Sequence, residues 1–193
     1  LYIGNSGTPA TELNITGTST VSSYAFTYYN HLTSVDFADD ITTINTYAFD
    51  NCASLKTVYF GNALRTIGAY AFRNTVLETI ELPGSLTSIQ SNAFENNKRL
   101  SKVTIDNGAG LNIAANAFLN CNNINEGLSI SSVENWMGNT TFGNEYSNPL
   151  VYAGKLYLND ELMSTLYIDM VATIKNYSFY GCTSIRTIYV YDN

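Results

Sequence analysis

The sequence predicts a single α/β solenoid, in which short windings stack along one axis and each covers the apolar side of the next. Three observations lead to this prediction. An Ala-Phe pair recurs in steps of 22 to 24 residues, an Ile or Val lies five residues before each Phe, and an apolar-x-apolar triplet follows. A repeat of this length is typical of architectures whose windings contact mainly their neighbours. The array is expected to cover residues 1–193, with one insertion at about 131–165.

The Phe of each pair is expected to fill the core, while the small residue before it lets adjacent windings approach. The repeated Phe residues are Phe26, Phe49, Phe72, Phe94, Phe118 and, after a longer step, Phe179. Ala precedes the first five of them, and Ser178 precedes the last. The segment that leads from the β-branched residue to the Phe is predicted to be a short helical or 3-10 piece on the convex face.

The apolar triplet is predicted to form a short strand with one buried side, because its apolar residues alternate with polar ones. In one winding Val58 and Phe60 point inward, whereas Tyr59 points to solvent. The equivalent inward pairs are Val35/Phe37, Ile80/Leu82, Val103/Ile105, Leu128/Ile130 and Ile188/Val190. Stacked windings would join these strands into a parallel sheet on the concave face, with strands about 4.8 Å apart.

Asn or Gly recurs two residues after the Phe of most windings, at Asn51, Asn74, Asn96, Asn120 and Gly181. These residue types tolerate left-handed backbone, so this column is expected to end each turn of the outer segment. The Asn side chains are also expected to hydrogen-bond to the next winding and form a ladder.

The three cysteines occupy one position of the repeat, three residues after the Phe, at Cys52, Cys121 and Cys182. Cys52 and Cys121 are three windings apart, which at strand spacing is roughly 14 Å. A disulfide needs Cα atoms within about 7 Å. We therefore expect small buried residues rather than a disulfide framework or a metal site.

Composition excludes two classes of partner. The formal net charge is −7 and the pI is about 4.5, with only 9 Lys and Arg residues spread along the chain. Nucleic acids and anionic membranes are bound by clustered cationic side chains, which this sequence lacks. No apolar run approaches the length needed to span a bilayer, so no membrane insertion is expected.

The segment from Leu77 to Phe94 reads Leu-x-x-Ile-x-Leu-Pro-x-x-Leu-x-x-Ile-x-x-x-Ala-Phe and resembles the BspA-like class of leucine-rich repeats. The segment from Tyr177 to Ile185 resembles the same class, and the likeness extends over nearly the whole chain. It implies a right-handed leucine-rich-repeat solenoid. It also implies an extracellular or cell-surface location in a host-associated bacterium or a parasitic protist, and adhesion to host proteins, cells or other microbes. The class carries no catalytic residues and no cofactor.

The outward column of the strands is the candidate binding surface, because the curvature of a solenoid creates an extended concave face. Tyr is frequent on recognition surfaces, since it supplies a large contact area at low entropy cost. We expect a protein or glycan ligand there. The candidate residues are Asp36, Tyr59, Glu81, Thr104, Tyr167, Tyr189 and Tyr191.

The insertion offers a second candidate surface, because insertions in repeat arrays are often used for binding. Its candidate contacts are Trp136, Phe142 and Tyr146. A short helix is predicted at 133–137, followed by a meander with turns at 153–154 and 159–160. The alternative, which we favour, is a self-packed excursion that buries Trp136.

Three functions remain open at this stage. The first is a non-enzymatic adhesion module of a surface protein, and the second is a passive spacer in a longer array. The third and most remote is a thiol enzyme that uses His31 and Cys52, for which no third group is in place to orient the imidazole. No zinc-binding or EF-hand spacing and no phosphate-binding loop occurs in the sequence.

Overall fold

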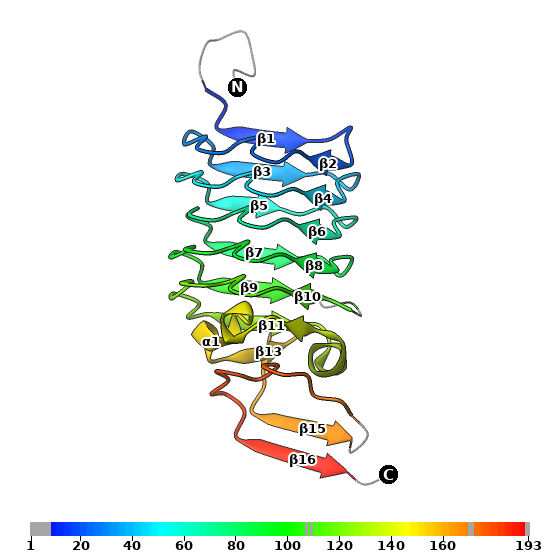
Figure 1. The fold of residues 1–193 in the computed structure, drawn as a ribbon. Coiled ribbons are helices and arrows are strands. Elements are labelled where there is room, and N and C mark those ends of the chain that lie inside the picture. Colours follow the sequence, from blue (N-terminus) through cyan, green and yellow to red (C-terminus); the bar gives the residue numbers. More distant parts are fainter. Residues whose placement is uncertain (1–8, 107, 109, 170–171, 192–193) are drawn as a thin grey trace.

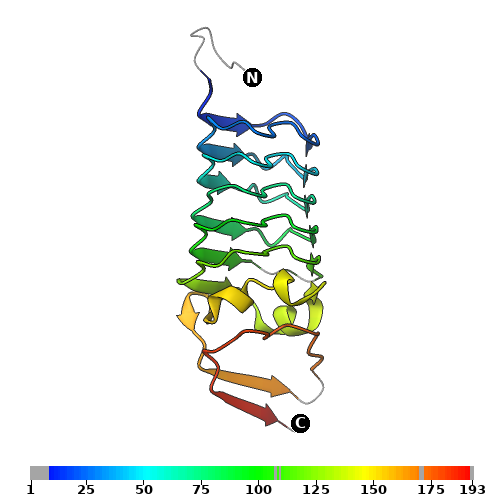
Figure 2. The ribbon, with the colours of Figure 1, turned by 60° about the vertical axis from the view of Figure 1, so that its left-hand side comes forward.

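The computed structural model describes residues 9–106, 108, 110–169 and 172–191, which form a rod of stacked windings (Figure 1). The rod has about 8 turns, and the predicted leucine-rich-repeat solenoid with parallel strands is confirmed. The windings from β1 (Glu12–Ile15) to β11 (Gly127–Ile130) stack with little curvature in Figures 1 and 2.

The strands predicted from the apolar triplets, together with one strand of the insertion, line one side of the rod, which we call the long-strand wall. They are β1, β3 (Ser34–Phe37), β5 (Thr57–Tyr59), β7 (Thr79–Leu82), β9 (Lys102–Ile105), β11, β13 (Leu156–Leu158), β15 (Thr165–Asp169) and β16 (Thr187–Tyr191). The wall divides into three sheets, which are β1-β3-β5, β7-β9-β11-β13-β14 and β15-β16. All neighbours are parallel except β13 and β14 (Glu161–Leu162), which form an antiparallel hairpin.

A second parallel sheet of two-residue strands runs along another side of the rod. Its strands are β2 (Thr20–Val21), β4 (Thr43–Ile44), β6 (Thr66–Ile67), β8 (Ser88–Ile89), β10 (Asn112–Ile113) and β12 (Thr141–Phe142). Each strand of the windings from β2 to β10 ends at the β-branched residue that lies five positions before the Phe.

The segments after the short strands from β2 to β10 correct one part of the prediction, because each is a run of β-turns rather than a helical or 3-10 piece. In one winding Ala48 N donates to Asn45 O, and Cys52 N donates to Phe49 O. The third residues of these two turns, Tyr47 and Asn51, have φ of 60° and 58°. A left-handed residue at the third position is typical of type II turns, and its recurrence at every fourth position prevents helical continuation.

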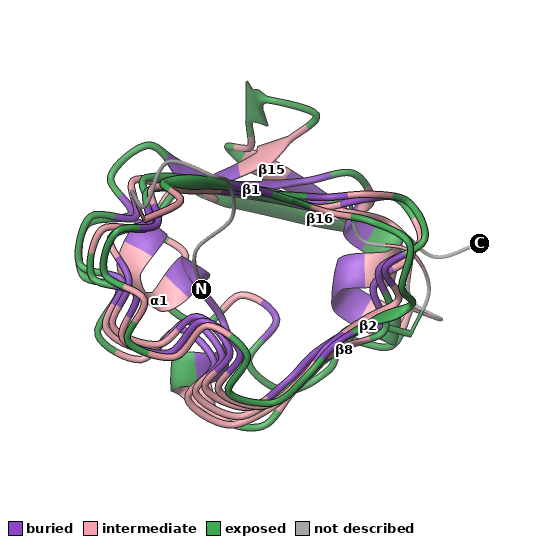
Figure 3. Ribbon diagram, turned by 90° about the horizontal axis from the view of Figure 1, so that it is seen from above, coloured by how far each residue is buried: buried purple, intermediate pink, exposed green. Residues whose placement is uncertain are grey.

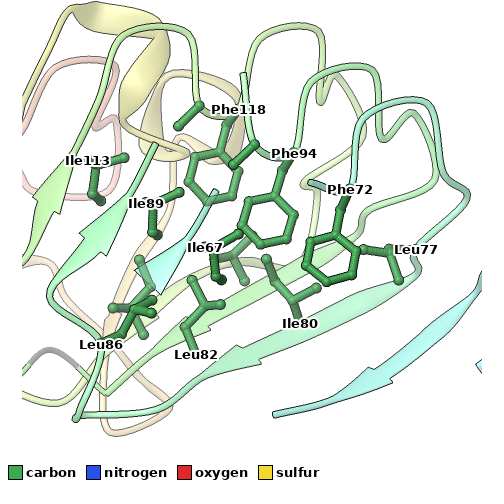
Figure 4. Packing of buried hydrophobic residues seen from close by; sticks show 14 of the residues in the cluster. Ile67, Phe72, Leu77, Ile80, Leu82, Leu86, Ile89, Phe94, Ile113 and Phe118 are labelled. Atoms are coloured by element: carbon green, nitrogen blue, oxygen red, sulfur yellow. The ribbon is translucent and has the colours of Figure 1, made fainter. Parts of the chain in front are cut away.

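The Phe residues from Phe26 to Phe118 form one continuous spine inside the rod, as predicted, and Figure 4 shows Phe72, Phe94 and Phe118 of this spine. Successive rings stack with centroids 5.0, 5.3, 5.5 and 5.2 Å apart from Phe26 to Phe118. Phe49, Phe72, Phe94 and Phe118 are fully buried, as are the Ala residues that precede them. Viewed along the axis, the windings superimpose as one ring, in which buried stretches of successive windings lie over one another (Figure 3).

The inward strand positions are buried from Val35 to Ile130 apart from Phe60, which is half-buried, and only the last pair differs clearly. Ile188 and Val190 of β16 are 58% and 59% exposed. Their register partners in β15, Leu166 and Ile168, are buried, so Ile188 and Val190 lie on the inner side of the strand, as predicted. They are exposed because no described segment packs over the inner side of β16.

The Asn column forms the expected ladder, and its bonds join side chains rather than backbone groups. Asn74 Nδ2 donates to Asn51 Oδ1 at 3.0 Å, and Asn96 Nδ2 donates to Asn74 Oδ1 at 2.8 Å. Asn120 Nδ2 continues the ladder to Asn96 Oδ1 at 2.9 Å. These four residues have φ between 56° and 63°, and Gly181 in the same column has φ 83°. The left-handed backbone predicted for this column is confirmed.

The insertion contains a further winding that the sequence did not reveal. β12 pairs in parallel with β10 on the short-strand side, and β13 pairs in parallel with β11 on the long-strand wall. A π-helix (Asn135–Asn139) precedes β12, and a 3-10 helix (Glu145–Ser147) and α1 (Leu150–Ala153) lie between β12 and β13. Phe118 N donates to Tyr146 O, as Phe94 N donates to Ala117 O one winding earlier.

Candidate binding surface

The outward side chains of the long-strand wall form a column in strict strand register. Asp36 pairs with Tyr59 across β3 and β5, Glu81 pairs with Thr104 across β7 and β9, and Tyr167 pairs with Tyr189 across β15 and β16. The pleat places such partners side by side on one surface at about strand spacing. The structure therefore aligns the sequence-predicted residues, but it interrupts the column at two places.

The first interruption is a gap in the sheet between β5 and β7. No backbone hydrogen bond joins residues 57–59 to residues 79–82 in the part of the chain that the structure describes. The two segments are linked only before the strands begin, where Glu78 N donates to Lys56 O at 3.1 Å and Val76 N donates to Leu55 O. Elsewhere along this wall, from β1 to β5 and from β7 to β13, successive strands pair normally.

The gap contains a pocket of about 190 Å³, lined by Thr57, Val58, Tyr59, Phe60, Thr79 and Glu81. The pocket occurs in the winding whose corner, the segment that leads from the repeated Phe to the following Leu, is one residue shorter. Five residues lead from Phe72 to Leu77, whereas six lead from Phe49 to Leu55. A corner with one residue fewer cannot follow the path of its neighbours, and the two strands separate beyond the corner.

Tyr59 is flanked by two carboxylates at this gap. Its ring is 63% exposed, with Asp36 as its register partner on one side and Glu81 across the pocket on the other. Among the described residues the ion pairs are Arg73–Asp50 and Lys102–Asp160, so neither flanking carboxylate has a cationic partner. This part of the wall is therefore an acidic surface around one exposed aromatic ring.

The second interruption is the β13–β14 hairpin, which covers the middle of the wall. Ser129, which follows Thr104 in the column, is buried, and its Oγ accepts a hydrogen bond from Asp160 N. Lys102 Nζ lies 3.0 Å from Asp160 Oδ1, and this contact holds the pKa of the Asp160 carboxyl below its usual range. Thr104 is half-buried beside this hairpin.

Three tyrosines gather at the far end of the wall. The ring of Tyr167 stacks on Tyr189 at 5.4 Å and on Tyr191 at 6.1 Å. The three side chains are between 50% and 60% exposed. The structure thus brings together the late tyrosines of the predicted surface and separates them from the acidic part around Tyr59.

The insertion residues divide between core and surface. Trp136 is fully buried, its Nε1 donates to Ser178 O at 2.6 Å, and Phe142 packs edge-on against it at 5.0 Å. Trp136 cannot serve as the contact residue that the second surface required, because it fills the core of the extra winding. Tyr146 is 39% exposed and remains accessible.

The chemistry around the cysteines opposes nucleophilic activation. Burial raises the pKa of the Cys52 and Cys121 thiols to about 12. Their Sγ atoms donate to Phe26 O at 3.1 Å and Phe94 O at 3.2 Å, so each thiol satisfies a carbonyl of the preceding winding. His31 is exposed and contacts the ring of Tyr29. In the described residues no group of three His, Cys, Asp or Glu side chains could hold a metal ion.

One cluster of side chains on the turn side was not predicted from the sequence. Tyr24, Tyr47 and Tyr70 stack at 4.9 and 4.8 Å, and the Arg73 guanidinium lies 4.7 Å from the Tyr70 ring centroid. Arg73 also forms a two-pronged contact with buried Asp50 at 2.8 and 2.9 Å, which raises the pKa of the guanidinium. The signal in the sequence was a Tyr two residues before four of the Phe residues, the first three of which lie in consecutive windings.

These features define a leucine-rich-repeat solenoid with exposed aromatic and acidic groups on one wall. Residues 19–148 and 155–193 match the BspA type leucine-rich-repeat region, in 6 copies. The chain belongs to this family, whose members and fold are generally non-enzymatic. No curated protein matches the chain.

Several solved structures of leucine-rich-repeat and surface proteins are similar to the chain. The pneumococcal vaccine antigen PcpA matches with a TM-score of 0.59 at 17% identity, over 95% of this chain and 42% of PcpA. A leucine-rich cell surface protein from Faecalibacterium prausnitzii matches with a TM-score of 0.48 at 16% identity, over 95% of this chain and 33% of that protein. The leucine-rich-repeat protein of T. pallidum gives 0.47 at 20% identity, over 95% and 64%. The chain thus spans between 33% and 64% of the length of these proteins.

None of the helices in the described residues has the length and apolar character needed to cross a bilayer.

Proposed function

We propose that the chain is a non-enzymatic binding module of a bacterial cell-surface protein and that it contacts a protein or glycan ligand through the long-strand wall. The observation that carries this proposal is the set of exposed tyrosines in register on that wall. Tyr59, Tyr167, Tyr189 and Tyr191 are each at least half exposed, and none of them is needed to fill the core.

The location of the exposed groups favours recognition over a purely mechanical role. On a wall that already buries its inner residues, an exposed aromatic side chain adds only cross-strand contacts, such as the stacking of Tyr167 on Tyr189, whereas it supplies contact area and one hydroxyl to a ligand. The proposed cell-surface location and adhesive role are supported by the family to which the chain belongs rather than by any single residue. The insertion contributes to the same surface through the β13–β14 hairpin, whereas Tyr146 lies on the turn side of the rod.

The experiment is a binding assay of the chain against immobilised extracellular matrix proteins and a glycan array. The test variant combines Y59A, E81A and Y189A, three changes on the long-strand wall that leave the core intact. The control variant combines Y24N and Y28N, which remove two tyrosines that are 61% and 66% exposed on the turn side. Both control positions have φ near 60°, and Asn already occupies equivalent positions in later windings, so the fold should be kept.

The test variant should lose binding to whichever ligand the array identifies, while the control variant should bind as the parent chain does. Equal binding by the parent and the test variant would reject the wall as the recognition surface. A passive spacer is then the better function. The continuous Phe spine and the Asn ladder support that alternative, because they stiffen the rod whether or not a ligand binds.

A further inference from the structure

We propose that the gap between β5 and β7 binds one arginine side chain of a protein ligand. This inference rests on the proposed function and deepens it, because it names the chemical group that one part of the wall recognises. It draws on four features of the gap: its open backbone groups, its two carboxylates, its exposed ring and its apolar floor.

The backbone groups of Val58 face the gap. Val58 pairs with Val35 in register, and in a parallel sheet the N–H and C=O of one residue point to the same neighbouring strand. Continuing the ladder through β5 therefore leaves the groups of Val58 facing β7, where no backbone bond forms in the described part of the chain. Backbone carbonyls of this kind are strong acceptors that seek a donor. The gap thus offers acceptors to a ligand that carries several N–H groups.

The charges around the gap select a cation. Asp36 and Glu81 are exposed, lie on either side of Tyr59 and have no ion pair among the described residues. Lys56, which lies two residues before Val58 in the sequence, likewise forms no ion pair among the described residues and leaves both carboxylates available. The net charge of −7 adds a long-range attraction for basic ligands.

The shape of the gap distinguishes arginine from other cations. The pocket of about 190 Å³ has Val58 and Phe60 at its base, and it is large enough for one side chain rather than for a sugar chain or a strand. An apolar base accommodates the methylene stem of a long cationic side chain. A guanidinium is planar and carries five N–H donors, so it can stack on the Tyr59 ring while it donates to a carboxylate and a carbonyl. A lysine ammonium has the charge but cannot stack in this way.

The test uses three small probes and the intact chain. They are N-acetyl-arginine amide, N-acetyl-lysine amide, and N-acetyl-citrulline amide, which keeps the shape of arginine without its charge. Binding is followed by the amide shifts of an isotope-labelled sample in two-dimensional NMR. The variants are D36N and E81Q, and the control is E12Q, which removes an exposed carboxylate from β1 on the same wall.

Arginine amide should shift the amides of Val58, Tyr59 and Glu81, while the citrulline probe should leave them unchanged. Each of D36N and E81Q should weaken the arginine affinity about fivefold, the effect of one screened ion pair of about 1 kcal/mol. E12Q should change it less than about twofold. Equal shifts from arginine and citrulline, shifts centred on Tyr167 to Tyr191, or equal losses in E12Q and E81Q would each overturn the arginine site.

Failure of this inference and failure of the proposed function give different results. The probe titration needs no partner, so it can succeed even when no matrix protein or glycan binds the wall. Conversely, a chain that loses matrix binding on the triple wall substitution but ignores arginine amide keeps the proposed function and loses the arginine site.

Discussion

Replacement of Asn74 tests how much the Asn ladder and the left-handed backbone each contribute to the free energy of unfolding. Asn74 has φ 56°, donates to Asn51 Oδ1 at 3.0 Å and accepts from Asn96 Nδ2 at 2.8 Å. N74A removes both hydrogen bonds and places a Cβ-bearing residue with no compensating polar group in the left-handed region. N74G removes the same bonds but suits that backbone, as Gly181 does in the same column.

The magnitudes follow from these two terms. Two half-buried side-chain hydrogen bonds contribute about 1 to 3 kcal/mol together. Left-handed backbone costs an ordinary L-residue about 1 to 2 kcal/mol, while glycine loses about 0.5 to 1 kcal/mol through its flexibility in the unfolded chain. N74A should therefore lower the free energy of unfolding by about 3 kcal/mol, and N74G by about 1 kcal/mol less than N74A.

The assay is equilibrium urea unfolding followed by far-UV circular dichroism and by Trp136 emission. Trp136 is the only Trp and is buried in the insertion winding, so its signal shows whether the distant end of the rod unfolds together with Asn74. N62A is the matched control, because Asn62 is exposed and does not have positive φ. It should change the unfolding free energy by less than about 0.5 kcal/mol.

Two results would refute this reasoning. If N74A and N74G had equal stability, the left-handed backbone would not be a constraint at this position. If both variants unfolded as the parent does, the ladder bonds would contribute nothing beyond what water supplies to the same amides.

Three further predictions concern other columns. The Cys52 and Cys121 thiols should resist a disulfide reagent in the folded chain and react after denaturation. Burial raises the pKa of both thiols from 9.0 to about 12. Their contribution to the free energy of unfolding should therefore be complete below about pH 9 and should disappear as the pH rises toward 12, which unfolding measured as a function of pH would show. R73M should lower the unfolding free energy by about 2 to 3 kcal/mol because Asp50 is left buried without its partner, whereas R73M/D50N should recover part of the loss. Insertion of one Ala directly after Thr75 should restore the regular corner, slow hydrogen exchange of the β5 amides and abolish the arginine site; unchanged exchange would show that the short corner is not the cause of the gap.

The features that follow the repeat were predictable from the sequence. The Phe spine, the buried Ala column and the left-handed Asn column all depend on which residue type fits a position that every winding shares, and one sequence displays each position several times. The conformation of the segment after each short strand was not predictable in the same way. Type II turns and a 3-10 turn need similar residues, and the choice depends on hydrogen bonds between windings, such as the one from Phe49 N to Ala71 O.

The extra winding in the insertion was hidden because it keeps the contacts of the repeat without its residues. Phe142 takes the register place of Ile113, and the carbonyl of Tyr146 accepts the bond that a repeat Ala accepts elsewhere. Asn144 Nδ2 donates to Asn116 Oδ1 at 2.7 Å, as in a regular ladder. Backbone carbonyls and register are independent of side-chain identity, so a residue pattern cannot reveal them.

The candidate surface was likewise predictable only where it follows the repeat. Its column of outward residues was predictable, because alternation along a strand fixes which side chains leave the core. The gap between β5 and β7 and the hairpin over Ser129 were not, although both arise where the repeat departs from its period: a step of 22 residues from Phe72 to Phe94, and a step of 61 from Phe118 to Phe179. A regular winding presents paired backbone and a covered core, so it offers a ligand only side chains. A departure from the period opens backbone groups or adds a hairpin. The recognition chemistry of this wall is therefore expected to concentrate at its irregular windings, while the regular ones hold those windings in a fixed order along the rod.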